Sequence, residues 1–277
     1  MSEPLLNVSD LFVEYPGQGF RAPGVKVLKD LSVSIEAGQT LGLVGESGSG
    51  KSTLGRAILG LAPITAGSIR FDGRELAGLT RRERRALATE IQVVFQDPYT
   101  SLNPALTIGD TLREPLGRIG LSGADAAARV RSLLDQVGLP ADTEHRLPRE
   151  FSGGQRQRVA IARALALRPR LIVCDEPVSA LDLSTQSRVL ELFIDIQRQT
   201  GVTYLFISHD LSVIRYISHR VAVMFDGEIV ESGGVDSVTT VPEHPYTRRL
   251  FLASPVPDPA AQAERREQRR KFAAQSV

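Results

Sequence analysis

Cysteine is almost absent from this sequence. Of its 277 residues, only Cys174 is a cysteine. One cysteine cannot close a disulfide within the chain, and it cannot build a four-cysteine zinc or iron–sulfur site. A reducing, cytoplasmic environment therefore fits the composition. Cys174 itself is most simply a small, buried apolar residue.

Long hydrophobic runs are also lacking. No apolar run approaches the roughly 18 residues that a membrane-spanning helix needs. The first residues, Met1 to Pro4, have neither the basic region nor the apolar region of a signal peptide. We therefore expect a chain that stays on the cytoplasmic side and meets a membrane only through a partner.

The sequence also has no excess of charge of either sign. The sequence has 33 Lys and Arg against 32 Asp and Glu, a formal net charge of +1. Nucleic-acid-binding domains usually carry a basic excess, so we expect no nucleic-acid partner. The cluster Arg81 to Arg85 could contact phosphates or lipid headgroups, but the solvated face of a helix is the simpler interpretation. An apolar fraction of 42% leaves enough material for a sizeable core.

What the sequence does contain is a glycine-rich stretch of the form G-x-x-x-x-G-K-[ST]. It lies between a predicted buried strand, Thr40 to Val44, and a predicted helix, Thr53 to Leu61; its residues are Gly45, Glu46, Ser47, Gly48, Ser49, Gly50, Lys51, Ser52 and Thr53. The glycines let backbone N–H groups wrap around a β-phosphate, and the helix start adds its dipole. Lys51 would reach the β- and γ-phosphates of a nucleoside triphosphate, and the Ser52 hydroxyl would bind Mg²⁺. A glycine-rich turn that binds nothing is the alternative, but the strand-loop-helix context favours a nucleotide site.

Chemically active side chains follow two further predicted strands. The apolar run from Leu171 ends in Asp175 and Glu176, and the run from Thr203 ends at His209. In parallel sheets, functional residues lie at the carboxyl ends of strands. Asp175 is placed to hold Mg²⁺, directly or through water, and Glu176 to act as the base for an attacking water. Two solvent-facing acids without a function are a weak alternative beside a phosphate loop.

The rest of the chain surrounds these strands. Alternation predicts half-buried strands at Leu5 to Tyr15 and Val27 to Ile35, and a buried strand at Ile91 to Phe95 leads into Gln96. Tyr15 can stack on an adenine or cap the core, and its spacing favours neither. Helical patterns predict a helical insertion from Pro98 to about Leu165.

Three weaker signals complete the pattern. The insertion ends at Ser152, Gly153, Gly154 and Gln155, which open a helix and make a second potential anion-binding helix start, although taken alone this is only a loop-to-helix junction. Asp182 precedes a helix predicted to end near Gln199. Beyond Gly234 the pattern weakens to a short helix at His244-Pro245-Tyr246-Thr247 and a charged tail at Glu264 to Lys271.

Six motifs thus stand in one order: the phosphate loop, Gln96, Ser-Gly-Gly-Gln, the apolar run with Asp175 and Glu176, Ser179-Ala180-Leu181-Asp182, and His209. Together they resemble the ATP-binding-cassette (ABC) ATPases over about Leu5 to Gly233. Phe151 departs from the leucine usual in that family but remains apolar. The segments from Phe95 to Pro104, Arg113 to Leu116 and His244 to Thr247 resemble more narrowly the second ATPase of oligopeptide, dipeptide and nickel importers.

The resemblance implies a fold and a division into domains. The fold would be α/β, a phosphate-loop NTPase core with a small antiparallel β subdomain and a helical insertion. Residues 1–240 would form the ATPase domain, with the helical subdomain at about 98–165, and residues 241–277 an importer-type extension with a charged tail. Many of these importer ATPases carry a cysteine cluster after this tail, and since this sequence has none, we expect no iron–sulfur centre.

The resemblance to ABC ATPases also implies an activity, cofactors and partners. The chain would be an ATP-hydrolysing subunit, with ATP and Mg²⁺, that drives import of peptides or a related small solute, including nickel or a metal chelate. Its partners would be a second ATPase subunit, identical or a paralogue, two transmembrane permease subunits and, indirectly, an extracytoplasmic substrate-binding protein. The chain would then be peripheral, on the cytoplasmic face of the inner membrane.

The resemblance carries over to individual residues. ATP would lie between two cassettes facing head to tail, so Ser152, Gly153, Gly154 and Gln155 would serve the partner's ATP. Gln96 would touch Mg²⁺ and the attacking water. His209 would hold the γ-phosphate and the water in line, Asp182 would shape the contact across the dimer, and Tyr15 would stack on adenine.

Other classes of protein explain the motifs less well. ABC ATPases of DNA repair insert a long coiled coil between the phosphate loop and the signature, which is the Ser-Gly-Gly-Gln motif at Ser152 to Gln155. Here that interval is far too short. Translation factors of the family carry two cassettes in one chain, and this chain has one. A phosphate-loop kinase leaves Ser152 to Gln155 and His209 unexplained.

Overall fold

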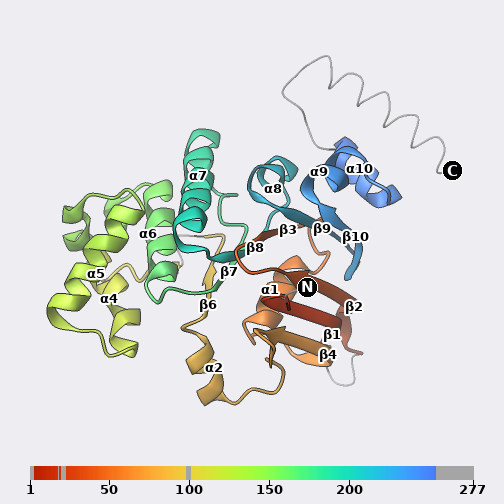
Figure 1. Ribbon diagram of the computed structural model, residues 1–277, viewed down its shortest axis with the longest axis horizontal. Helices are drawn as coiled ribbons and strands as arrows, with labels where there is room; N and C mark the ends of the chain where they lie inside the picture. Colours follow the sequence, from red (N-terminus) through yellow and green to blue (C-terminus); the bar gives the residue numbers. More distant parts are fainter. Residues whose placement is uncertain (1–2, 18, 20–22, 98–100, 254–277) are drawn as a thin grey trace.

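The structure, a computed structural model, describes residues 3–17, 19, 23–97 and 101–253. Two β-sheets and a set of helices make up this part of the chain (Figure 1). The larger sheet has the strand order β10-β9-β3-β8-β7-β6 and is parallel except for β10, which runs antiparallel to β9. Its strands are β3 (Thr40–Val44), β6 (Ile91–Val94), β7 (Leu171–Asp175), β8 (Thr203–Ile207), β9 (Arg220–Phe225) and β10 (Glu228–Gly234).

The smaller sheet is antiparallel and has the order β2-β1-β4-β5. Its strands are β1 (Leu6–Tyr15), β2 (Val25–Ile35), β4 (Ile64–Phe71) and β5 (Arg74–Glu75). Asp72 and Gly73 turn the chain from β4 to β5 with φ values of 51° and 72°. Positive φ at both central residues matches the right-handed twist of a hairpin, which is why an Asp-Gly pair stands there.

Helices cover the larger sheet and extend to one side of it (Figure 1). Their bounds are α1 (Lys51–Ile58), α2 (Arg81–Leu87), α4 (Ile108–Arg118), α5 (Gly123–Gln136), α6 (Gly153–Leu165), α7 (Leu183–Thr200), α8 (Leu211–Ile217), α9 (Val235–Thr240) and α10 (Pro245–Ala253). Helices α4, α5 and α6 lie together at one end of the molecule, within the predicted insertion. Among the described residues, no helix has both the length and the apolar content to cross a bilayer.

The parallel strands are buried on both faces, and alternate side chains feed two hydrophobic cores. Val173, Leu205 and Ile207 pack on the side of the smaller sheet and α1. Cys174 and Phe206 pack on the opposite side, in the core that includes α6, α7 and α8. Burying one such aliphatic side chain contributes about 1.5–3 kcal/mol, so a shift of one residue in register would exchange the two cores and is strongly disfavoured.

Some predicted boundaries differ from the structure. Helix α1 begins at Lys51 and not at Thr53, so the end of the phosphate loop is already the first helical turn. Helix α9 has no counterpart in the prediction because its six residues bury one apolar side chain, Val238, which gives no periodic signal. The charged tail and residues 98–100 lie outside the described residues.

Candidate functional site

The phosphate loop joins β3 to α1 and lies against the β9–β10 hairpin. Gly45 has a φ of 154°, and a Cβ placed on it would come within 2.1 Å of the Met224 carbonyl oxygen. Only glycine can stand that close to the neighbouring strand. The N–H of Gly227, in the hairpin turn, donates to the Ser49 carbonyl at 3.0 Å. The fold therefore holds this loop from one side and leaves Glu46 to Gly48 exposed.

Lys51 is 6% exposed, which is unusual for a lysine. Its Nζ donates to the carbonyl oxygens of Gly45 and Glu46, both at 2.8 Å. Burial lowers the Lys51 pKa, and the nearby carboxylates of Glu176, Asp175 and Glu46 act in the opposite direction. A cation held against carbonyl dipoles in a buried site is well placed to turn to phosphate oxygens, which carry full charge.

The Ser49 hydroxyl is another buried group of the loop. Ser49 is 6% exposed, and its Oγ has no hydrogen-bond partner in the part of the chain that the structure describes. Buried polar groups are normally paired, so an unpaired one needs an explanation. A phosphate bound in the loop would supply the missing acceptor.

Ser52 and Asp175 meet across the carboxyl edge of the larger sheet. The Ser52 Oγ donates to the Asp175 Oδ1 at 2.8 Å. Burial raises the Asp175 pKa, and the Ser52 hydrogen bond only partly offsets this. Two converging oxygens suit a hard cation such as Mg²⁺. Within the described residues no group of three or more His, Cys, Asp or Glu side chains could hold a metal alone, so phosphate and water oxygens would complete the shell.

Glu176 and His209 meet at the same edge, because β7 and β8 are neighbours and both end there. The Glu176 Oε1 lies 3.1 Å from the His209 Nδ1. Glu176 takes a φ of 49°, and its N–H donates to the Ile207 carbonyl. Since a non-glycine residue in this region is strained, the hydrogen bond to β8 is part of what sets the direction of the carboxylate.

The signature residues lie apart from the phosphate loop, on α6. Ser152 caps this helix: its Oγ accepts from the Gln155 N–H, and its own N–H donates to the Gln155 Oε1. Ser152 is exposed, and the first amides of the helix have no partner within it. In the described chain no hydrogen bond or ion pair joins residues 152–155 to residues 45–53. The structure therefore brings together the phosphate loop, Asp175, Glu176 and His209, and it leaves the signature outside that cluster.

Asp182 caps the neighbouring helix, α7. Its Oδ1 accepts from the Ser184 hydroxyl at 2.7 Å and the Thr185 N–H at 3.0 Å, and these bonds hold the Asp182 pKa well below its usual range. A Cβ on Gly154 would lie 2.2 Å from the Thr185 Cγ2. The starts of α6 and α7 are therefore in contact, and the glycine at position 154 is what allows it.

Two predicted site residues have no role assigned by these contacts. Gln96 is exposed after the end of β6, and the described chain gives it no bond to Ser52 or Asp175. Tyr15, at the end of β1, is half-buried and packs on the core beside α1. Adenine stacking by Tyr15 and magnesium contact by Gln96 stay predictions.

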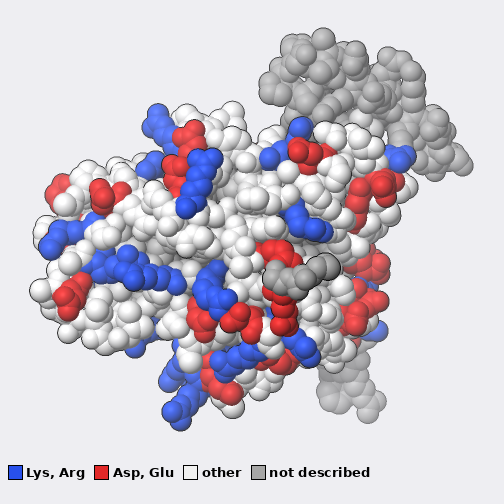
Figure 2. Space-filling model, viewed as in Figure 1, with Lys and Arg blue, Asp and Glu red and all other residues white. Residues whose placement is uncertain are grey.

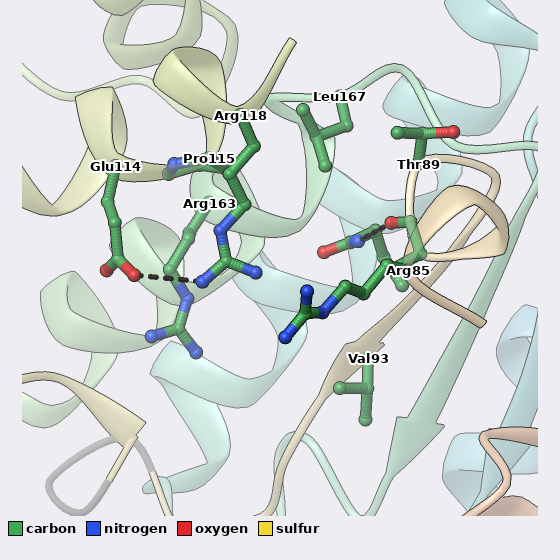
Figure 3. Close-up of a pocket in the computed structure, with 10 residues that line it drawn as sticks. Arg85, Thr89, Val93, Glu114, Pro115, Arg118, Arg163 and Leu167 are labelled. Atoms are coloured by element: carbon green, nitrogen blue, oxygen red, sulfur yellow. Dashed lines mark hydrogen bonds and ion pairs between the residues drawn. The ribbon is translucent and has the colours of Figure 1, made fainter. Parts of the chain in front are cut away.

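The structure adds two features that the sequence analysis missed. The first is Tyr246 on α10, whose Oη accepts from the N–H of Glu46 in the phosphate loop at 3.0 Å. The second is a cavity of about 700 Å³ between α2 with β6 and α4 with α6. Arg85 and Arg118 point toward each other across this cavity, and Arg118 pairs with Glu114 at 3.2 Å (Figure 3). The sequence analysis named several of these residues, but their contacts could not be predicted, because each contact joins segments that are distant along the chain.

The loop, the acids and the histidine at one sheet edge define a phosphate-loop nucleotide-binding protein of the cassette type. Residues 28–179 match the ABC transporter family, and the chain belongs to that family. A solved dimeric ATP-binding cassette in a post-hydrolysis state with ADP and Pi is 30% identical with a TM-score of 0.73, covering 83% of this chain and 98% of that one. CbiO1 from Clostridium perfringens, part of the transporter complex CbiONQ, is 26% identical with a TM-score of 0.76, covering 91% of this chain and 96% of that one. The predicted cassette fold is confirmed.

Two curated relatives are more similar in sequence. A putative peptide import ATP-binding protein of Brucella ovis is 49% identical over 263 residues, covering 95% of this chain and 82% of that protein. The glutathione import ATP-binding protein GsiA of Escherichia coli is 50% identical over 269 residues, covering 95% of this chain. The chain spans only 43% of the length of GsiA.

Proposed function

We propose that this chain is an ATP-hydrolysing subunit of an ABC importer that drives uptake of peptides or a related small solute. The observation that carries the proposal is the cluster at the carboxyl edge of the larger sheet, where Ser52 meets Asp175 and Glu176 meets His209 beside the phosphate loop. The names of the relatives, which concern peptide and glutathione import, favour peptide-like cargo over nickel.

The chemistry follows from where these side chains lie. Lys51 and the amides of the loop bind the phosphates of ATP, and Ser52 with Asp175 would hold Mg²⁺, which neutralises phosphate charge. Glu176 takes a proton from the attacking water, and His209 keeps the water and the γ-phosphate in line. Glu176 is 20% exposed, so it can receive a proton from a bound water and return it to solvent.

The exposed position of Ser152, at the start of α6, supports a site shared by two cassettes. The Gly153 and Gly154 amides at the start of α6 are helix-start donors for an anion, and in the described chain no hydrogen bond joins them to its own phosphate loop. A second cassette, identical or a paralogue, would supply the ATP that these amides bind. Its binding would draw the two surfaces together, and hydrolysis would release them.

The cavity between α2 and α4 is proposed as the docking site of a permease segment, on the cytoplasmic face of the membrane. Its wall carries Arg85, Arg118 and Arg163 against one carboxylate, Glu114 (Figure 3). This balance favours a short partner segment with acidic side chains. On the face seen in Figure 2, charges of both signs are interspersed, with no broad basic area that would suit a nucleic acid.

The proposal is tested by uptake in cells that lack this chain but express its permease and partner cassette. Supplying the wild-type chain should restore uptake of a labelled peptide, and supplying Glu176→Gln should not. Full uptake with the Gln variant would contradict the proposed activity. Uptake of labelled nickel but of no peptide would contradict the proposed cargo.

Fractionation tests the docking site. The wild-type chain should sediment with membranes only when the permease is present. Arg85→Glu with Arg118→Glu should reduce this, whereas Arg198→Glu, an exposed change on α7, should not. Equal sedimentation of all three chains would contradict docking at the cavity.

A further inference from the structure

Tyr246 lies 200 residues from the phosphate loop in sequence but touches it in space. Tyr246 is 3% exposed, and its Oη accepts a hydrogen bond from the Glu46 N–H at 3.0 Å. Burial raises the pKa of the Tyr246 phenol, and its oxygen accepts this bond through a lone pair. Helix α10 thus supplies a buried acceptor to the loop.

This bond joins Tyr246 to Lys51 through a single peptide group. The N–H of Glu46 and the carbonyl of Gly45 belong to the same planar unit, and in a trans peptide they point in opposite directions. The N–H end is held by Tyr246, and the carbonyl end accepts from the Lys51 Nζ at 2.8 Å. Fixing one end fixes the direction of the other, and hydrogen bonds in such a series strengthen one another.

The surroundings keep Tyr246 in place. Its ring packs on that of Phe225, at the end of β9, with 4.3 Å between ring centroids. The start of α10 is held from β10, where the Glu231 carboxylate accepts from the N–H groups of Glu243 and His244 at 2.8 and 3.0 Å. The helix is therefore attached both to the edge of the sheet and to the loop.

We propose that Tyr246 is a positioning residue for ATP binding. Its hydroxyl sets the orientation of the Gly45–Glu46 peptide, and through this peptide it sets where the Lys51 ammonium stands before ATP arrives. A loop already held in this orientation has less freedom to lose when it closes on a triphosphate. The inference rests on the nucleotide site proposed above and extends it to α10, which carries no phosphate-binding motif.

The test is the affinity of the full chain for a fluorescent ATP analogue in the presence of Mg²⁺. Tyr246→Phe keeps the ring and its contact with Phe225 but removes the acceptor, so the dissociation constant should rise about fivefold, the typical weight of one hydrogen bond. Glu231→Gln weakens the anchor of α10 and should raise it by a smaller factor.

Tyr204→Phe is the matched control. Tyr204 is also buried, and its hydroxyl donates to the Phe193 carbonyl at 3.2 Å, away from the loop. This variant should lose thermal stability as Tyr246→Phe does but bind the analogue as the wild type does. If both variants lost affinity equally, the effect would be general destabilisation and the positioning role would be wrong.

Lys51→Ala separates this inference from the function on which it rests. Unchanged affinity in Lys51→Ala would overturn the nucleotide site itself. Loss of affinity in Lys51→Ala together with wild-type affinity in Tyr246→Phe would overturn only the role of Tyr246.

Discussion

The phosphate-loop side and the signature side of this molecule are built differently. Around the loop, the Lys51 ammonium is buried against backbone carbonyls. Ser52 donates a hydrogen bond to Asp175 at the end of β7. Glu176 contacts His209, which follows β8. On the signature side, Ser152 and Asp182 are exposed, and their side chains cap their own helices. Folding alone assembles the first half of the site. We propose that the second half, at the exposed start of α6, is completed by another molecule.

The difference lies in where the backbone donors point. Glycines at 45, 48 and 50 turn the loop back on itself, so its donors converge on a point within the chain. The signature glycines begin a straight helix, so their donors point along its axis, away from the chain. The changes described below are ways to disable one side while sparing the other.

The largest effect is expected from Glu176→Gln on the phosphate-loop side. The amide keeps the shape of the carboxylate but removes its basicity, so ATP hydrolysis should fall by about 10²–10⁴-fold. ATP binding should persist, because Lys51 and Ser52 are untouched. Steady-state phosphate release beside analogue binding measures both quantities, and turnover near the wild-type rate would exclude Glu176 as the base.

Lys51→Ala should instead remove binding. The variant takes a buried cation away from the phosphates, and losses for such pairs correspond to about 30-fold or more in affinity. The signature helix should keep its fold, because in the described chain no hydrogen bond or ion pair joins residues 152–155 to the phosphate loop. Titration with the fluorescent analogue gives the affinity, and circular dichroism checks the helices; a variant that binds normally would contradict the role of Lys51.

Gly154→Ala should disturb the signature side through packing. The added methyl would collide with Thr185, and overpacking of about 1–3 kcal/mol should lower the melting temperature by about 2–10 °C. Gly117→Ala on α4 is the matched control, since a Cβ there meets nothing within 4 Å, and it should leave the melting temperature unchanged or raise it.

A second change identifies the contact responsible. Thr185→Ser removes the methyl group that Gly154→Ala would strike, so the double variant should recover most of the lost stability. If the double variant were as unstable as Gly154→Ala, the contact between α6 and α7 would not explain the loss.

The smallest effect concerns Asp182 and depends on pH. Its hydrogen bonds hold the Asp182 pKa below the value of about 3.9 expected in the unfolded chain, so the ionised carboxylate stabilises the fold above that pH. Protonation removes this contribution as the pH falls through the folded pKa. Asp182→Ala should therefore melt a few degrees below the wild type at pH 7, because the helix cap is lost. This difference in melting temperature should become smaller below about pH 4. Melting curves recorded across this pH range measure the difference, and a difference in melting temperature that did not change with pH would contradict the role of the charge.

Much of the phosphate-loop side was predictable from sequence, for a physical reason. Carboxyl ends of adjacent parallel strands meet at one edge, so an acid after one strand and a histidine after the next had to come near the loop. The strand order, with β7 beside β8, comes from the structure. The roles of Gln96 and Tyr15 stay predictions, because each needs a ligand to define its contact.

The features that sequence could not reveal depend on packing between distant segments. Tyr246 reaches Glu46 only because β10 and Glu231 bring α10 back to the loop. The sequence marks Gly154 as part of the signature, but its packing against Thr185 is seen only in the structure. The cavity beside Arg85 and Arg118 exists only once α2 and α4 are placed on either side of it. None of these contacts can be recognised from a local sequence pattern, because each joins segments that lie far apart along the chain.

The central claim, that each signature serves the ATP of the other cassette, is tested most directly by Gly153→Asp. A carboxylate in the first turn of α6 suits the helix, so the variant should fold, but it repels an approaching γ-phosphate. The measurement is photocrosslinking of an ATP analogue to each subunit of the assembled pair, with hydrolysis recorded in the same sample. The account predicts that the Gly153→Asp chain is labelled through its own phosphate loop as strongly as the wild type, while hydrolysis fails at the site whose loop belongs to the partner. Loss of labelling on the variant chain itself, in a folded protein, would contradict it.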